Sequence, residues 1–93
     1  MMDEIKRGDG EFFITQNGEK KAEITFSHDN DSNIVIEHTY VAEELGGQGI
    51  GKQLVAKVVE KARAENKKII SQCDYAESQL KKHEEYHDVL GSA

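Results

Sequence analysis

The residues that point most directly to chemistry form a glycine-rich run from Glu44 to Lys52, with the sequence ELGGQGIGK. It holds four of the eight glycines in the chain. A strand-like segment precedes this run and an amphipathic helical pattern follows it. A glycine-rich turn in that position presents backbone N–H groups at a helix N-terminus, where they have no intrahelical partner and where the helix dipole favours an anion. The run therefore predicts a site that binds a phosphorylated cofactor through main-chain contacts.

Two side chains outside this run have types that could react. His38 lies in the strand-like segment before the glycines, and its imidazole titrates near neutral pH, as a general base requires. The alternative is a strand histidine packed beside Ile36. Cys73 ends a later strand-like run just before a helix N-terminus, where the pKa of a thiol can fall. The alternative for Cys73 is a small buried hydrophobic residue.

Three short strands should position the glycine run from its N-terminal side. Alternating apolar residues predict strands at 11–15, 22–27 and 33–39, and the Asn17-Gly18 pair predicts a hairpin between the first two. The three strands are expected to form an antiparallel meander. In the third strand, simple alternation places Ile34, Ile36 and His38 on one face, and the other face receives Val35, Glu37 and Thr39.

A helix should position the run from its C-terminal side. Apolar residues from Ile50 to Ala62 recur at helical spacing over about three turns. A β-prone run at 68–73 follows and should lie parallel to strand 33–39, because a helix joins them. Asp74 then begins a second helix. The expected fold class is α+β: an antiparallel meander, a β-α-β unit and a C-terminal helix, in a single domain over residues 1–93.

Three other sequence motifs offer alternative interpretations. Gly46, Gly51 and Lys52 fit the P-loop pattern G-x-x-x-x-G-K-[ST], but Gln53 replaces the hydroxyl residue that would bind magnesium. The dinucleotide fingerprint G-x-G-x-x-G fails, because a lysine and a leucine occupy its third glycine position in the two possible registers. The segment from His83 to His87 reads H-E-x-x-H, as in zinc proteases, yet charged residues surround it, so a solvated helix end is expected.

The glycine run resembles the pyrophosphate loop [Q/R]-x-x-G-x-[G/A] of the GNAT superfamily of acyl-CoA-dependent N-acetyltransferases. Gly49-Ile50-Gly51 matches its glycine half, and Gly46 stands at the Arg or Gln position. In detail the chain resembles small stand-alone GNAT-like proteins that carry H-T-x-V, E-L-x-G-Q-G-x-G-K and C-x-[YF]. The corresponding segments here are His38 to Val41, Glu44 to Lys52 and Cys73 to Tyr75. The resemblance covers residues from about 20 to 90.

This resemblance implies a minimal GNAT-like fold with acetyl-CoA (coenzyme A) as the cofactor. The pantetheine arm would follow Thr39, Tyr40 and Val41. The pyrophosphate would lie on the loop residues Gly46, Gly47, Gln48, Gly49, Ile50, Gly51 and Lys52. The thioester would then lie near His38, as general base, and Cys73, as acetyl acceptor or as a wall of the thioester pocket. Tyr75 or Tyr86 could donate a proton to the departing thiolate.

The function implied is transfer of an acetyl group from CoA to an amine, on a small molecule or on a protein. A CoA-binding or acyl-sensing module with little turnover is the main alternative, and a magnesium-dependent nucleotide binder is a third. The net charge of −6, without a basic run, argues against nucleic acid as a partner. The single cysteine and the lack of a membrane-length apolar run favour a cytoplasmic protein with no membrane contact, as a monomer or weak homodimer.

Overall fold

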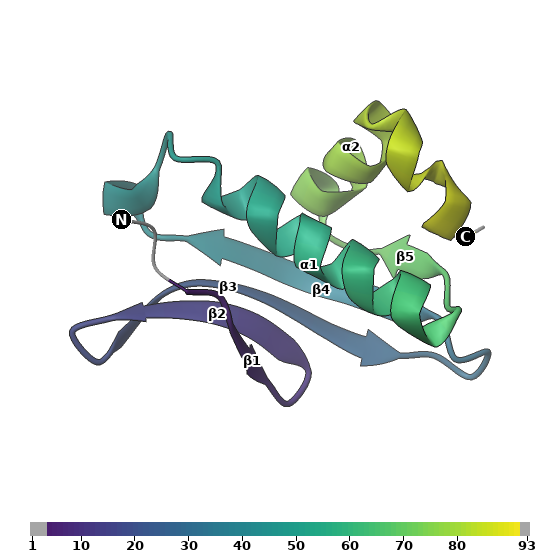
Figure 1. Cartoon of the computed structure of the whole chain (residues 1–93), viewed down its shortest axis with the longest axis horizontal. Coiled ribbons are helices and arrows are strands. Elements are labelled where there is room, and N and C mark those ends of the chain that lie inside the picture. Colours follow the sequence, from purple (N-terminus) through teal and green to yellow (C-terminus); the bar gives the residue numbers. More distant parts are fainter. Residues whose placement is uncertain (1–3, 92–93) are drawn as a thin grey trace.

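A computed structural model describes residues 4–91 of the chain. Four strands come first: β1 (Lys6–Gly8), β2 (Glu11–Gln16), β3 (Glu19–His28) and β4 (Ile34–Val41). A 3-10 turn, η1 (Glu43–Leu45), leads to helix α1 (Ile50–Glu65) and then to strand β5 (Ile69–Ser71). Helix α2 (Asp74–Lys82) and a second 3-10 segment, η2 (Glu84–Val89), complete this part of the chain, as Figure 1 shows.

The strands form one five-stranded sheet in the order β1-β2-β3-β4-β5. The first four strands pair antiparallel, and β5 pairs parallel to β4, so the predicted meander and β-α-β unit are confirmed. Strand β1 was not predicted from the sequence. Its polar residues, Lys6 and Arg7, show no alternation because the strand lies at the sheet edge and pairs through its backbone with Phe12 and Phe13 of β2.

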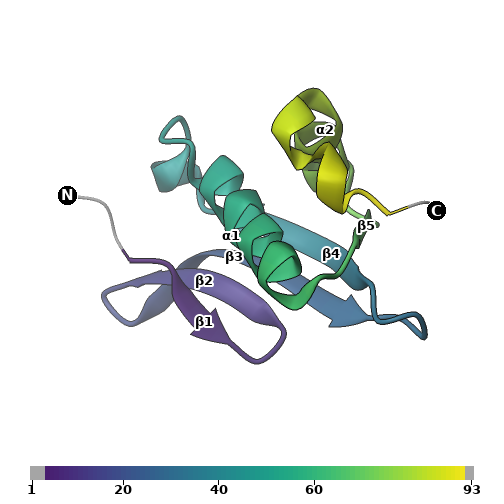
Figure 2. The same cartoon turned by 45° about the vertical axis from the view of Figure 1, so that its right-hand side comes forward.

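Both helices lie on the same face of the sheet. Helix α1 contacts β2, β3 and β4, while α2 contacts β4 and β5, and Figure 2 shows the two helices side by side above the strands. The apolar stripe of α1, centred on Leu54, Val55 and Val58, is fully buried against the alternating residues of β2 and β3. Within residues 4–91, no helix has the length and apolar character needed to cross a membrane.

A β-bulge in β4 changes which side chains face the helices. Ile36 pairs with Phe26 of β3, but the next pair is His38 with Thr25, so Glu37 is an extra residue without a partner. Beyond the bulge the alternation is therefore inverted: Thr39 lies on the helix face and His38 on the opposite face. The expectation that Ile34, Ile36 and His38 share one face is wrong, because simple alternation does not allow for the extra residue.

Strands β4 and β5 part at the same point. Their pairing extends from Ile34–Ile69 to Ile36–Ser71, and the last backbone hydrogen bond runs from the Gln72 N–H to the Ile36 carbonyl at 2.8 Å. After Ile36, β4 continues to Val41 with no β5 partner. The bulge and the end of the pairing thus coincide, and the β5 side of residues 39–41 is left without a strand.

Candidate functional site

The glycine run forms the connection between β4 and α1, as predicted. Gly47 and Gly49 have φ angles of +80° and +72°, a region that glycine adopts at little cost and that L side chains rarely adopt. Gly49 is the N-cap of α1, so no side chain caps the helix, and the first turn contains no acidic residue. The N–H groups of the first turn are therefore available to an anion, which the helix dipole also favours.

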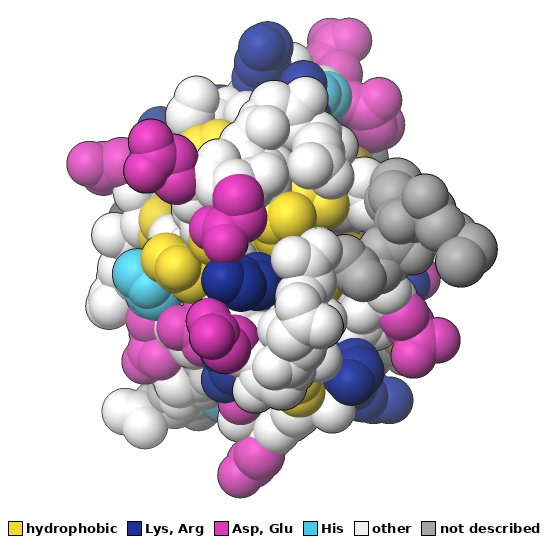
Figure 3. Space-filling model, turned by 90° about the vertical axis from the view of Figure 1, so that its left-hand side faces the viewer, with side chains coloured by type: hydrophobic (Ala, Val, Ile, Leu, Met, Phe, Trp, Pro, Cys, Tyr) yellow, Lys and Arg dark blue, Asp and Glu magenta, His cyan; other side chains and the backbone are white. Residues whose placement is uncertain are grey.

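A pocket of about 400 Å³ opens beside this loop. Its lining comes from β4, η1, the loop and the N-termini of both helices: Thr39, Val41, Leu45, Gly46, Gly47, Gly49, Ile50, Gly51, Lys52 and Tyr75. Figure 3 looks onto this end of the molecule, where apolar side chains lie at the bottom of a hollow. The pocket combines the backbone donors of the loop with an apolar floor.

Most residues predicted for the cofactor site line this pocket, but two do not. Tyr40 is 42% exposed and pairs with Glu23 on the outer face of the sheet, because the bulge inverts the face of every residue beyond Glu37. Gln48 is an exposed residue of the loop. In the other direction, Leu45 lines the pocket although the sequence reasoning did not select it. Its apolar character within an acidic linker is the signal that could have identified it.

Tyr75 connects the two helix N-termini at the pocket. A Cβ atom added to Gly51 would lie 2.6 Å from the Tyr75 hydroxyl oxygen and 2.9 Å from Cζ, so the ring packs directly on the first turn of α1. Any larger residue at position 51 would require the Tyr75 ring, which is 42% exposed, to move. Burial raises the pKa of Tyr75, and the nearby Cys73 raises it further, so its hydroxyl remains protonated at neutral pH.

Cys73 lies at the N-cap of α2, partly buried against the core. Its Sγ is 3.4 Å from the Oγ1 of Thr39, a pocket residue, across the gap where β4 and β5 part. Burial alone would raise the pKa of this thiol. The hydrogen bond with Thr39 and those from the backbone N–H groups of Ala76, Tyr75 and Thr39 outweigh burial and hold the pKa below its usual value.

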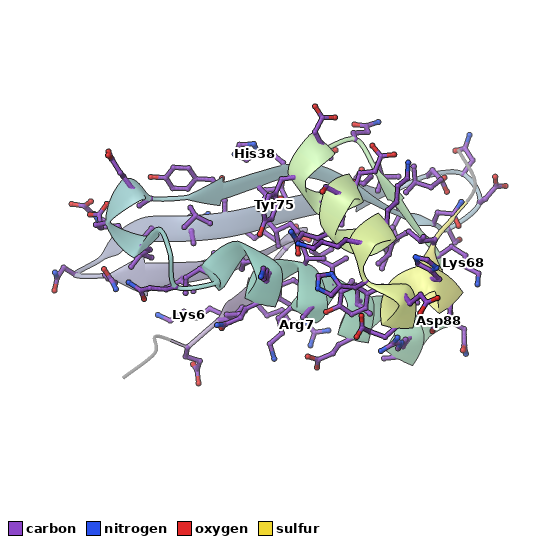
Figure 4. The ribbon with its side chains drawn as sticks, turned by 90° about the horizontal axis from the view of Figure 1, so that it is seen from above. Lys6, Arg7, His38, Lys68, Tyr75 and Asp88 are labelled. Atoms are coloured by element: carbon purple, nitrogen blue, oxygen red, sulfur yellow. The ribbon has the colours of Figure 1, made fainter. Side chains whose placement is uncertain are left out.

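His38 is not brought to the pocket. Its side chain is 58% exposed, and its Nε2 lies 4.0 Å from a carboxylate oxygen of Glu23. In Figure 4 His38 lies beyond the sheet, on the side away from α1, whereas Tyr75 lies between β4 and α1. The structure therefore brings Cys73, Thr39 and Tyr75 together, but it places His38 on the other face of the sheet.

The H-E-x-x-H segment does not form a zinc-binding helix. Helix α2 ends at Lys82, and residues 84–89 continue as a 3-10 segment, so His83 and His87 are not one turn apart on an α-helix. Each imidazole bonds a backbone carbonyl instead, His83 that of Gln79 and His87 that of Lys81. Among the described residues, no group of three or more metal-ligating side chains lies together.

Comparisons with known proteins agree with this geometry. The profile of the GCN5-related N-acetyl-transferase family matches residues 11–89. The solution NMR structure of a GCN5-like candidate N-acetyltransferase from Staphylococcus aureus is 44% identical, with a TM-score of 0.82 over 97% of this chain and 89% of that one. No sequence among curated proteins matches the chain.

Larger proteins share the fold. A GNAT-family acetyltransferase candidate from Staphylococcus aureus is 27% identical, with a TM-score of 0.58 over 64% of this chain and 52% of that one. A ribosomal-protein-alanine N-acetyltransferase from Brucella melitensis is 19% identical, with a TM-score of 0.57 over 89% of this chain and 61% of that one. The chain thus spans little more than half the length of these two proteins. From the profile match and the 44% identical structure, the chain belongs to the GCN5-related N-acetyltransferase family.

Proposed function

We propose that the chain binds acetyl-CoA in the pocket beside the glycine loop and transfers the acetyl group to an amine. The observation that carries this proposal is the continuity of the pocket. It runs from the uncapped N-terminus of α1 to Thr39, on the stretch of β4 that β5 leaves unpaired. Membership of the family supports the class of reaction.

The residues present fit coenzyme A. A pyrophosphate needs backbone N–H donors and space beside them. The loop supplies the uncapped N-terminus of α1, and Gly47 and Gly49 leave open space where a side chain would stand. Lys52 adds a positive charge at the pocket wall. Gly46 contributes no side chain where the family pattern has Arg or Gln, so the anion would depend on backbone donors and Lys52. Val41, Leu45 and Ile50 provide apolar surface for the pantetheine arm.

Acetyl-CoA, when bound, supplies the acetyl group as a thioester. Cys73 offers a sulfur across the strand gap, with hydrogen bonds that hold the thiol pKa below its usual value, and this sulfur is the nucleophile or pocket wall that we assign to the acetyl group. Tyr75 keeps its proton and lines the same pocket, so it is the residue that could protonate a departing thiolate. His38 has no part in this arrangement. The amine must lose its proton to solvent or to a group that the acceptor brings.

An NMR titration of the labelled protein with acetyl-CoA tests the binding half of the proposal. We expect shift changes in residues 39–52 and at the N-terminus of α2, because these segments line the pocket. Spectra that do not change at millimolar ligand would overturn the proposal.

The transfer half is tested by mass spectrometry and by an acetylation assay with a small polyamine and a lysine peptide as probe acceptors. We expect turnover that Cys73→Ala abolishes while CoA-dependent shifts remain. A mass gain of one acetyl group on Cys73 would identify it as the acceptor. Binding with neither turnover nor labelling would favour the acyl-sensing module instead, since the same pocket serves both functions.

A further inference from the structure

The β-bulge in β4 aims one hydroxyl group at the cysteine. Because Glu37 is extra, Thr39 faces the helix side of the sheet, beside Ile24 of β3, although simple alternation would turn it outward. Bulges commonly redirect a side chain next to a functional site. At this position β5 no longer pairs with β4, so nothing separates the Thr39 hydroxyl from Cys73.

Hydrogen bonds hold both the backbone and the side chain of Cys73. The Ser71 hydroxyl accepts a hydrogen bond from the Cys73 N–H at 3.2 Å and donates one to the Cys73 carbonyl at 2.8 Å, which fixes the backbone. The side chain is held by Thr39, at 3.4 Å between Sγ and Oγ1. Thr39 also lines the pocket, whereas Cys73 is not among the lining residues, so this contact places the sulfur directly behind a residue of the pocket wall.

We propose that Thr39 is the positioning residue of Cys73: its hydroxyl accepts a hydrogen bond from the thiol and donates one to the thiolate, and it holds the sulfur next to the pocket. When the thiol ionises, its proton passes to solvent and the Thr39 O–H rotates toward the sulfur. The hydroxyl therefore favours the reactive form without itself reacting. This inference rests on the proposed function, in which Cys73 meets the acetyl group.

The surroundings leave Thr39 as the side chain that controls the charge of the sulfur. On α2, the titratable neighbours are Tyr75, which stays neutral, and the acids Asp74 and Glu77, which would disfavour a second negative charge. From β4, Thr39 is neutral and His38 lies on the far face. Burial raises the pKa of Cys73, and the effects that lower it are hydrogen bonds to the sulfur, of which the one with the Thr39 side chain is the largest.

The test is the pH dependence of Cys73 alkylation by iodoacetamide, in the full chain without ligand. The chain has one cysteine, so the rate reports on Cys73 alone. Thr39→Val, which keeps the shape and removes the hydroxyl, should raise the midpoint of the rate profile by about one pH unit. Thr39→Ser keeps the hydroxyl and should stay close to wild type. Thr25→Val, the same change on the outer face of β3, is the matched control and should have no effect.

An unchanged midpoint in a folded Thr39→Val protein would overturn the inference. If this variant does not fold, Thr39→Ala with the same readout decides the question. The assay needs no CoA, so failure of the inference and failure of the proposed function can be told apart. A shifted midpoint without CoA binding would uphold the positioning role and reject the enzyme. CoA binding with an unshifted midpoint would reject the positioning role and uphold the binding half of the proposed function.

Discussion

Cys73, Thr39 and His38 show how the environment of a side chain decides its chemistry. Cys73 is a single cysteine at a helix N-cap, and the hydrogen bonds around its sulfur lower its thiol pKa despite partial burial. Thr39 and His38 are neighbours in the sequence, yet one faces the pocket and the other faces solvent beside Glu23. The histidine is thus separated from the site by the thickness of the sheet.

The position of His38 leads to a prediction for its substitution. His38→Ala should leave the acetyl-transfer rate within about twofold of wild type, because the imidazole lies on the face opposite the pocket. The measurement is the initial rate with acetyl-CoA across pH 6 to 9, with Cys73→Ala as the inactive control. A loss of rate that follows the imidazole titration would restore His38 as the general base.

The two ends of helix α1 differ: the N-terminus belongs to the site, and the C-terminus carries a charge that neighbouring lysines offset. Its N-terminus is left uncapped at Gly49, which suits an anion, while its C-terminus is closed by Asn66 in the left-handed conformation. Glu65, the last helical residue, places a negative charge at the negative end of the helix dipole. Lys61 and Lys67 offset this charge, with Nζ atoms 2.5 Å and 3.1 Å from the carboxylate.

This arrangement predicts a pH-dependent contribution of Glu65 to stability. Hydrogen bonds from Lys61, and then from Lys67, lower the pKa of Glu65 from 4.5 to about 2. Because the folded-state pKa is the lower one, the stabilisation is complete above pH 4.5 and is lost as the pH falls toward 2. Glu65→Gln should therefore be less stable than wild type at pH 7, and the difference should shrink on acidification. Urea unfolding from pH 7 to pH 3 measures it.

The matched control is Glu60→Gln, on the same helix. Glu60 is 69% exposed and its oxygen is 3.8 Å from Lys57, so its substitution should change stability little at any of these pH values. A difference for Glu65→Gln that stayed constant between pH 7 and pH 3 would show that the ion pairs do not stabilise the fold.

At the scale of the whole molecule, the site depends on segments far apart in the sequence. The pocket takes residues from β4, η1, α1 and α2, and all of these elements share one apolar core on one face of the sheet. A ligand that contacts all of these elements should stabilise the entire chain against unfolding, because it binds the folded state alone.

We therefore expect acetyl-CoA to raise the global stability. At about 100 times its dissociation constant, the free energy of unfolding should rise by about 2.7 kcal/mol. Thermal unfolding followed by circular dichroism measures this. ATP with magnesium is the comparison ligand and should leave the unfolding temperature unchanged, because Gln53 replaces the hydroxyl that a P-loop uses for the metal. Equal stabilisation by both ligands would point to a general phosphate site.

Much of the architecture follows from local patterns. Alternation identified three of the four meander strands, helical spacing identified α1, and the Asn17-Gly18 turn and the glycine run marked the connections. These signals are readable because each depends on residues close together in the chain. The edge strand β1 was not predicted, because it pairs through backbone groups and its residues show no apolar alternation.

By itself, the sequence determined the order of the elements from β2 to α2, the glycine loop at the start of α1 and most of the residues that line the pocket. Only the tertiary structure decided which side chains meet there. One unpaired residue, Glu37, turns Thr39 inward and His38 outward, and the parting of β4 from β5 opens the space in which Thr39 contacts Cys73. A bulge depends on how two strands match over their length, so the alternation of one strand cannot reveal it.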